Sequence, residues 1–276
     1  MEEKPTTTQQ AIMNTFDRAA KNFGQRGPKH FEHFGRRLVE LAGVVSGSKV
    51  LDVATGRGAV LFPTADRVGP TGRVTAIDLA EGMIRETSAD IEHRQLGNVD
   101  VHRMDAQSLD FSSDSFDWVL AGFALFFFPR PAQALREFHR VLRPGGRLGL
   151  TTWEQYSEIP FRFLAYIEKY LPDDVRRAER ARNRFETAPV LEAALTEARF
   201  ASVSVNVEEA TLFFPDEETL WLTVAGGGMG RLLEIAGPAA SEKIRDEIIE
   251  AVRPTREDCG VPVWFRALVA FGTKGT

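Results

Sequence analysis

The chain has 276 residues, of which 43% are hydrophobic and 26% charged, and its net charge is −5. This composition is that of a globular enzyme with one large domain, and the acidic balance offers no overall basic footprint for nucleic-acid binding. The basic stretch at 176–184 is a local alternative, but a solvated helix face is the favoured interpretation of it. The single cysteine, Cys259, excludes internal disulfides and cysteine-rich metal sites. With no apolar run of ~20 residues to span a bilayer and no signal-peptide core in residues 1 to 10, a cytoplasmic location is expected.

The first half of the chain alternates between helical and extended patterns. A polar, disordered tail is expected at 1–10, and two short helices at about 11–23 and 29–43. Short apolar runs then alternate with helices, which is typical of a parallel sheet covered by helices on both faces. The predicted strands are 50–53, 73–77, 99–103, 118–121 and 147–152, with a helix at 131–142 before the last of them.

The alternation stops after residue 153. Residues 154–184 are aromatic and helical in pattern, which predicts an inserted lid, and a helix at 190–198 and strands at 203–207 and 263–272 complete the chain. We therefore expect three regions. These are an N-terminal tail and lid helix at 1–28, a cofactor-binding core at 29–153, and helical lid insertions with the last two strands of the same sheet at 154–276.

A glycine-bearing turn carries the strongest functional signal. Residues 50–60 read VLDVATGRGAV, and Asp78 follows Gly58 by twenty positions. A strand, a glycine turn and a second strand that ends in an acid place a nucleoside across the carboxyl edge of a parallel sheet, with the acid on the ribose diol. A dinucleotide site needs a small residue at position 61, where this chain has leucine. The turn therefore favours S-adenosylmethionine over NAD or FAD.

Four motifs occur in order: VLDVATGRGAV, GRVTAIDLAEGM, MDA at 104–106, and ALREFHRVLRPGGRLGLTTW. Together they resemble the class I S-adenosylmethionine-dependent methyltransferases, and within them the UbiE/COQ5-like branch (methyltransferase type 11). The resemblance covers residues 29–153 and implies a Rossmann-like α/β fold. Its seven-stranded, mostly parallel sheet would have the order 3-2-1-4-5-7-6, with an antiparallel strand 7 and a helical lid. It also implies S-adenosylmethionine as cofactor and S-adenosylhomocysteine as product.

The motifs assign the cofactor contacts. Gly56 and Gly58 let the backbone approach the methionine part, and the following helix favours its carboxylate. Asp52 either meets the amino group or orients the loop, while Asp78 accepts both ribose hydroxyls. Asp105 accepts from the adenine amino group or caps a turn. The remaining predicted cofactor contacts are Ala54, Leu79, Met83, Ala106, Ala121 and Phe123.

Two residues of the turn depart from the family pattern. Ala54 replaces the first glycine, and Arg57 stands where a small residue is more usual. The family tolerates such changes, so cofactor binding is still expected. The contacts that the turn itself makes with the cofactor do not follow from the motif.

The sequence contains candidate bases but no metal site. His30 and His33 share a face of a predicted helix. The resemblance implies that this helix folds over the cofactor, so that either histidine can reach a substrate proton, and a structural role is the competing interpretation. Tyr156, just past the fifth strand, can polarise a hydroxyl or lie in a solvated loop. A His-x-x-His pair without a third ligand does not predict a metal.

The acceptor is expected to be hydrophobic because the chain contains 20 phenylalanines and an aromatic lid. Candidate acceptor contacts are Phe31, Phe123, Phe127, Trp153, Trp221 and Met229. The favoured function is methyl transfer to an apolar small molecule of secondary metabolism by in-line displacement. A cyclase or isomerase that retains the cofactor and a non-catalytic binding protein are the alternatives. A monomer and a homodimer both fit the sequence.

Overall fold

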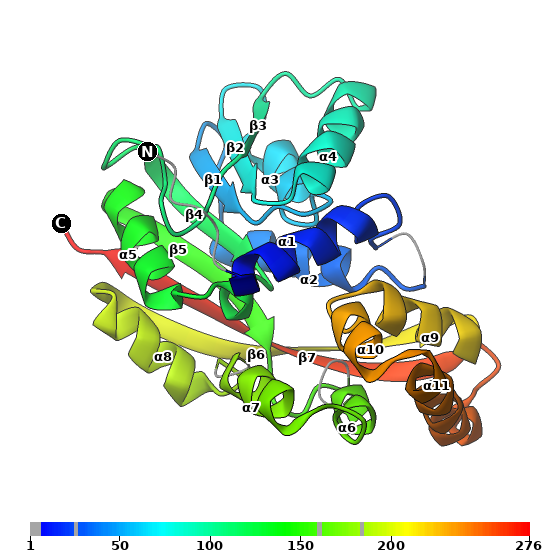
Figure 1. Ribbon diagram of the computed structural model, residues 1–276. Coiled ribbons are helices and arrows are strands. Elements are labelled where there is room, and N and C mark those ends of the chain that lie inside the picture. Colours follow the sequence, from blue (N-terminus) through cyan, green and yellow to red (C-terminus); the bar gives the residue numbers. More distant parts are fainter. Residues whose placement is uncertain (1–6, 25–26, 159–161, 183–184) are drawn as a thin grey trace.

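A single seven-stranded sheet forms the centre of the computed structural model, which describes residues 7–24, 27–158, 162–182 and 185–276 (Figure 1). Its strands are β1 (Lys49–Val53), β2 (Arg73–Asp78), β3 (Val99–Arg103), β4 (Phe116–Gly122), β5 (Leu142–Trp153), β6 (Phe200–Phe214) and β7 (Val261–Lys274). The order is β3-β2-β1-β4-β5-β7-β6. Neighbours from β3 to β5 are parallel, whereas β7 is antiparallel to β5 and β6. The predicted fold is confirmed.

Helices cover both faces of the sheet because successive residues of a buried strand point to opposite sides. Leu51 and Val53 of β1 pack with helices α5 (Pro131–Val141) and α8 (Ala188–Glu197). Val50, the residue before Leu51, packs with α2 (His30–Ala42) and α3 (Leu61–Val68) on the other face. Among the described residues, both faces are therefore covered by apolar side chains, which favours the carboxyl ends of the strands as the place for a ligand.

The lid consists of two helical insertions. Helices α6 (Phe163–Glu168) and α7 (Asp173–Arg182) follow β5, and α9 (Glu217–Gly226), α10 (Gly230–Ala236) and α11 (Pro238–Val252) lie between β6 and β7. The β6–β7 pairing continues to Phe214 and Val261, past the last β5–β7 pair at Trp153 and Ala267. This extension packs against the lid helices in a separate hydrophobic core. It also explains why β6 is longer than the predicted 203–207.

Helix α1 (Thr7–Ala19) crosses in front of the sheet, between the β1–β4 half and the lid helices (Figure 1). The predicted disorder is wrong for residues 7–10, which are helical, and residues 1–6 lie outside the described part. The helix begins early because it packs on α4 (Glu81–His93), with Met13 buried against Ala80 and Met83. Within the described residues, no helix combines the length and apolarity needed to cross a membrane.

Candidate active site

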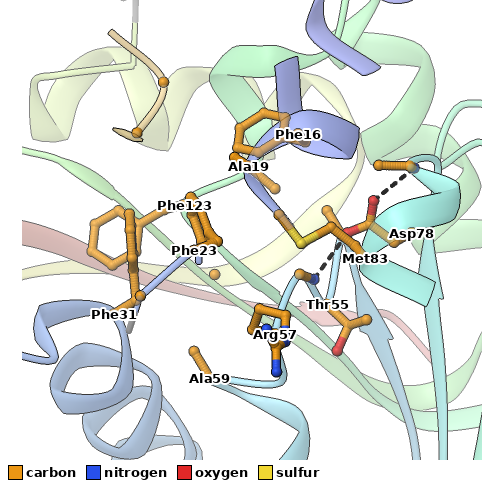
Figure 2. A pocket seen from close by; sticks show the side chains of 18 of the residues that line it. Phe16, Ala19, Phe23, Phe31, Thr55, Arg57, Ala59, Asp78, Met83 and Phe123 are labelled. Atoms are coloured by element: carbon orange, nitrogen blue, oxygen red, sulfur yellow. Dashed lines mark hydrogen bonds between the residues drawn. The ribbon is translucent and has the colours of Figure 1, made fainter. Parts of the chain in front are cut away.

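A cavity of about 1040 Å³ opens at the carboxyl ends of β1, β2 and β4. The glycine turn forms its floor, helices α1 and α2 contribute to its walls, and the α9–α10 turn closes its far side. Figure 2 shows Phe23, Phe31 and Phe123 on the side of the pocket opposite Asp78. The cavity thus has an acidic side, which the sheet supplies, and an aromatic side, to which the N-terminal helices contribute.

The turn after β1 has a backbone that few side chains permit. Ala54 and Gly56 have φ angles of 55° and 52°, in the left-handed region that favours glycine. Gly58 has a φ of 80°, and a β-carbon there would lie 2.4 Å from the ring of Phe62. Ala54 therefore holds a conformation that favours glycine, while a side chain at Gly58 would be strained by the positive φ and would have to displace the Phe62 ring.

Asp78 is fixed by the backbone around it. Its Oδ2 accepts a hydrogen bond from the Gly56 amide at 2.9 Å, and its Oδ1 accepts one from the Ala80 amide at 2.9 Å (Figure 2). Burial raises the pKa of Asp78, and the two amides act against that rise. Because each carboxylate oxygen can accept two hydrogen bonds, Asp78 can accept two more from a ligand in the cavity.

Asp52 is a buried acid near the end of β1, just before the turn, and it is one of the residues that line the cavity. Its Oδ2 accepts a hydrogen bond from the Thr55 hydroxyl at 2.6 Å, and its Oδ1 has no hydrogen-bond partner. Burial, followed by repulsion from Asp78, raises the pKa of Asp52 to about 7. A positive group placed beside Oδ1 would stabilise the charged form.

Asp105 joins the third-strand region to helix α1. It accepts hydrogen bonds from the backbone amide of Gln107 at 2.9 Å and from the Gln9 side chain at 2.8 Å. The turn contact matches one of the two roles expected of it. The contact with Gln9 ties the N-terminal helix to the same end of the cavity, and the role of Asp105 toward adenine stays a prediction.

The aromatic side is built on a strained residue that follows β4. Phe123 has a φ of 50°, and its amide donates to the Thr151 carbonyl oxygen at 3.0 Å. Its ring stacks on Trp153 with the centroids 4.0 Å apart, and the Phe31 ring stands edge-on to it at 5.6 Å. This geometry fixes a rigid apolar wall within the same cavity as the acidic side.

His30 lies at the edge of this wall. Its side chain is buried, and its ring stacks on Phe265 with the centroids 5.0 Å apart. Burial lowers the pKa of His30 to about 4, and its contact with the Pro28 carbonyl opposes that shift only in part. His30 is therefore neutral at physiological pH.

The structure brings most of the predicted site residues to the cavity but leaves four outside. The residues that line it are His30, Phe31, Asp52, Ala54, Gly56, Gly58, Asp78, Leu79, Met83, Asp105, Ala106, Phe123, Phe127, Trp153 and Met229. Ala121 and Trp221 are buried in hydrophobic cores instead. His33 is half-buried beside Phe34, and Tyr156 is 66% exposed. The structure therefore does not place Ala121, Trp221, His33 or Tyr156 at the cavity, a correction to the prediction that only the packing of the elements reveals.

Five residues that no sequence motif marks as site residues also line the cavity, namely Gln9, Phe16, Phe23, Arg57 and Glu179. One available signal was the spacing of Met13, Phe16 and Ala20, which places three apolar residues on one helix face. The only sequence signal at Arg57 is its departure from the family motif. Glu179 gave no signal, because it lies in a run of charged residues in the lid.

Comparison with known proteins agrees with this geometry. A family model described as a methyltransferase domain matches residues 50–146. Nocamycin O-methyltransferase of Saccharothrix syringae is 34% identical over 271 residues, covering 94% of this chain and 96% of the relative. Aklanonic acid methyltransferase DauC of Streptomyces sp. is 38% identical over 141 residues, covering 51% and 64%. The solved (4+2)-cyclase SpnF has the same fold, with a TM-score of 0.58, 18% identity and coverage of 100% and 99%.

The chain belongs to the class I S-adenosylmethionine-dependent methyltransferases. It is an enzyme that uses S-adenosylmethionine as its cofactor. The UbiE/COQ5-like branch stays a prediction within that family.

Proposed function

We propose that this enzyme methylates an oxygen atom of an apolar small molecule of secondary metabolism. The observation that carries this proposal is one continuous cavity with cofactor-motif acids on one side and a stacked aromatic wall on the other. The O-methyltransferase relative that matches nearly the whole chain supports oxygen as the acceptor atom. An aromatic wall favours an acceptor with a flat or extended apolar body.

In this proposal each of the three acids binds a different part of the cofactor. Asp78 accepts the ribose hydroxyls, Asp105 accepts from the adenine amino group, and Asp52 receives the ammonium on its unpaired oxygen. Leu79 and Met83 give apolar contact to the nucleoside. When bound, the cofactor supplies an electrophilic methyl group on a sulfonium ion.

The protein contributes position more than acid–base chemistry. An in-line displacement requires the acceptor oxygen to lie close to the methyl carbon and opposite the sulfur, and such positioning supplies ~7–11 kcal/mol of the barrier. The rigid Phe123–Trp153 pair supplies that positioning and excludes water. His30, with a pKa of about 4, is a weak base at neutral pH. The acceptor is therefore a hydroxyl that ionises readily, such as a phenol, an enol or a carboxylic acid.

A labelled-methyl assay tests the proposal. The enzyme is incubated with methyl-labelled S-adenosylmethionine and a panel of fused-ring phenols, enols and carboxylic acids, with matched apolar amines for comparison. We expect labelled ether or ester and one S-adenosylhomocysteine for each product. Preferred methylation of the amines would contradict the oxygen assignment. A rearranged product without S-adenosylhomocysteine would favour the cyclase alternative, and cofactor binding without any turnover would favour the binding protein.

Two tryptophans offer a matched test of the aromatic wall. Trp153→Leu should lower kcat/KM for the acceptor at least tenfold, because the ring that supports Phe123 is lost. Trp264→Leu removes an indole that is 37% exposed on β7 outside this cavity, and should leave kcat/KM within twofold. Equal losses in both variants would show that the aromatic wall has no specific part in catalysis.

A further inference from the structure

Two buried side-chain atoms lack hydrogen-bond partners in the described part of the chain, and both belong to the glycine turn. They are Oδ1 of Asp52 and Nε of Arg57. Buried polar atoms are almost always paired in folded proteins, so an unpaired one calls for a missing partner. One of these atoms is an acceptor on an acid and the other a donor on a base. Together they complement a group that carries an ammonium and a carboxylate, as an α-amino acid does.

Arg57 is held so that its guanidinium lines the cavity. Its side chain is 14% exposed and lies at the pocket floor between Thr55 and Ala59 (Figure 2). One terminal nitrogen donates to the Ala20 carbonyl oxygen at 2.9 Å, and the other donates to Asp90 at 2.6 Å. These two contacts fix the plane of the guanidinium and leave Nε as its nitrogen atom without a hydrogen-bond partner.

We propose that Arg57 binds the carboxylate of the methionine end of S-adenosylmethionine. Arg57 stands between Gly56 and Gly58, the two glycines that bring the backbone close to that end of the cofactor. Arginine is suited to this task because its planar donors match a carboxylate. Asp52, at the end of β1 just before the turn, binds the ammonium. The two residues together therefore bind both charged groups of the amino acid.

This assignment rests on the use of S-adenosylmethionine, which the family establishes, and does not depend on the acceptor. It competes with a purely structural role, in which Arg57 only ties the turn to the end of α1 and to α4. The two roles differ in one measurable respect. A structural tie supports every ligand of the pocket alike, whereas a carboxylate site matters only to ligands that carry the carboxylate.

Calorimetric titration with two ligands separates the roles. S-adenosylhomocysteine carries both charges, and its decarboxylated analogue, S-adenosyl-3-thiopropylamine, keeps the ammonium but lacks the carboxylate. We expect the unmodified enzyme to bind S-adenosylhomocysteine at least tenfold more tightly, which corresponds to about 1.4 kcal/mol. In Arg57→Met this preference should fall below threefold, chiefly through weaker binding of S-adenosylhomocysteine.

Asp90→Asn is the matched control, because it weakens the tie to α4 and keeps the guanidinium. We expect it to retain the tenfold preference, even where both affinities fall together. A preference below threefold in the unmodified enzyme would overturn the proposal without any variant, as would a preference that survives in a folded Arg57→Met. Because no acceptor is present, neither result bears on which molecule the enzyme methylates.

Discussion

Asp52 and Asp78 lie on adjacent strands, yet their two carboxylates have different hydrogen-bond partners. Asp78 accepts two backbone amides, which hold its oxygens in place at the end of β2. Asp52 is more deeply buried, has one hydroxyl partner and keeps one oxygen unpaired. The first arrangement suits a neutral diol, and the second suits a cation. Both acids have a raised pKa, because burial withdraws them from water before the cofactor arrives.

Removal of the Asp78 carboxyl group should weaken cofactor binding. We expect Asp78→Ala to reduce the affinity for S-adenosylmethionine by ~1.5–3 kcal/mol, the range for hydrogen bonds to a charged group. Calorimetric titration measures this loss, and circular dichroism checks that the variant is folded. An unchanged affinity in the folded variant would contradict the ribose assignment.

Neutralisation of Asp52 should stabilise the ligand-free protein at neutral pH. The unfolded carboxyl ionises near 3.8, whereas the folded one keeps its proton up to about 7. Between these values the folded state holds the extra proton, so the unmodified protein loses stability as pH rises. Asp52→Asn does not ionise, and its free energy of unfolding at pH 8 should exceed that of the unmodified protein by up to ~4 kcal/mol, at about 1.4 kcal/mol for each unit of pKa difference.

Urea denaturation of both proteins at pH 4.5 and pH 8 measures this difference. The gap should be small at the lower pH and grow toward the higher one. The same substitution should weaken S-adenosylhomocysteine binding, because the amide lacks the charge that attracts the ammonium. A gap that shrinks as pH rises would mean that Asp52 is ionised at little cost in the folded state.

Helix α1 covers the cavity through contacts made by its polar side chains. Gln9 bonds Asp105 at one end of the helix, and Asp17 accepts from the Gly82 amide at 2.8 Å near the other. Gly82 lies in the first turn of α4, whose own N-cap residue, Ala80, makes no side-chain cap. Asp17 therefore caps α4 from a distant part of the sequence, and the cover helix is coupled to the element that follows β2.

Loss of this cap should loosen α1. We expect Asp17→Ala to lower the free energy of unfolding by about 1 kcal/mol, the usual effect of removing an N-cap. Amide hydrogen exchange should speed up in α1 and the first turn of α4, because both lose a shared anchor. Arg18→Ala serves as control, since the ion pair of Arg18 with Glu234 is exposed, and it should change stability by less than 0.5 kcal/mol. Equal effects of the two substitutions would argue against the cap.

The cavity lies between the sheet core and the lid core, so a ligand in it touches both. Phe123 and Trp153 belong to the lid core, whereas Ala106 belongs to the core on one sheet face. Cofactor binding should therefore stabilise the molecule as one unit. The cavity is lined by elements from α1 to α10, which are far apart along the chain.

Saturation with S-adenosylhomocysteine tests this coupling. At a ligand concentration 100 times Kd, we expect the free energy of unfolding to rise by about 2.7 kcal/mol. Tryptophan fluorescence and far-ultraviolet circular dichroism should report the same shift in Tm, because the lid and the sheet unfold together. Separate shifts would show that the lid unfolds independently of the sheet.

Much of the sheet could be predicted from the sequence because its signals are local. A buried parallel strand is a short apolar run, and a strand that ends in a glycine turn or an acid marks its own carboxyl edge. The turn at 50–60, Asp78 and the strand order followed from such patterns together with the family resemblance, and the structure confirms that order. The acidic side of the cavity can therefore be predicted from the sequence.

The aromatic side depended on contacts between segments distant in sequence. Phe31 and Trp153 meet because α2 packs beside the end of β5, a closeness that no local pattern encodes. The same packing carries His30 into the cavity and leaves Tyr156 in solvent. The unpaired donor of Arg57 likewise arises only when Ala20 and Asp90 occupy its other nitrogens. The local sequence thus determines the acidic side of the cavity, where the cofactor motifs lie. The aromatic side depends on how distant helices pack, because side-chain packing is a property of the whole fold.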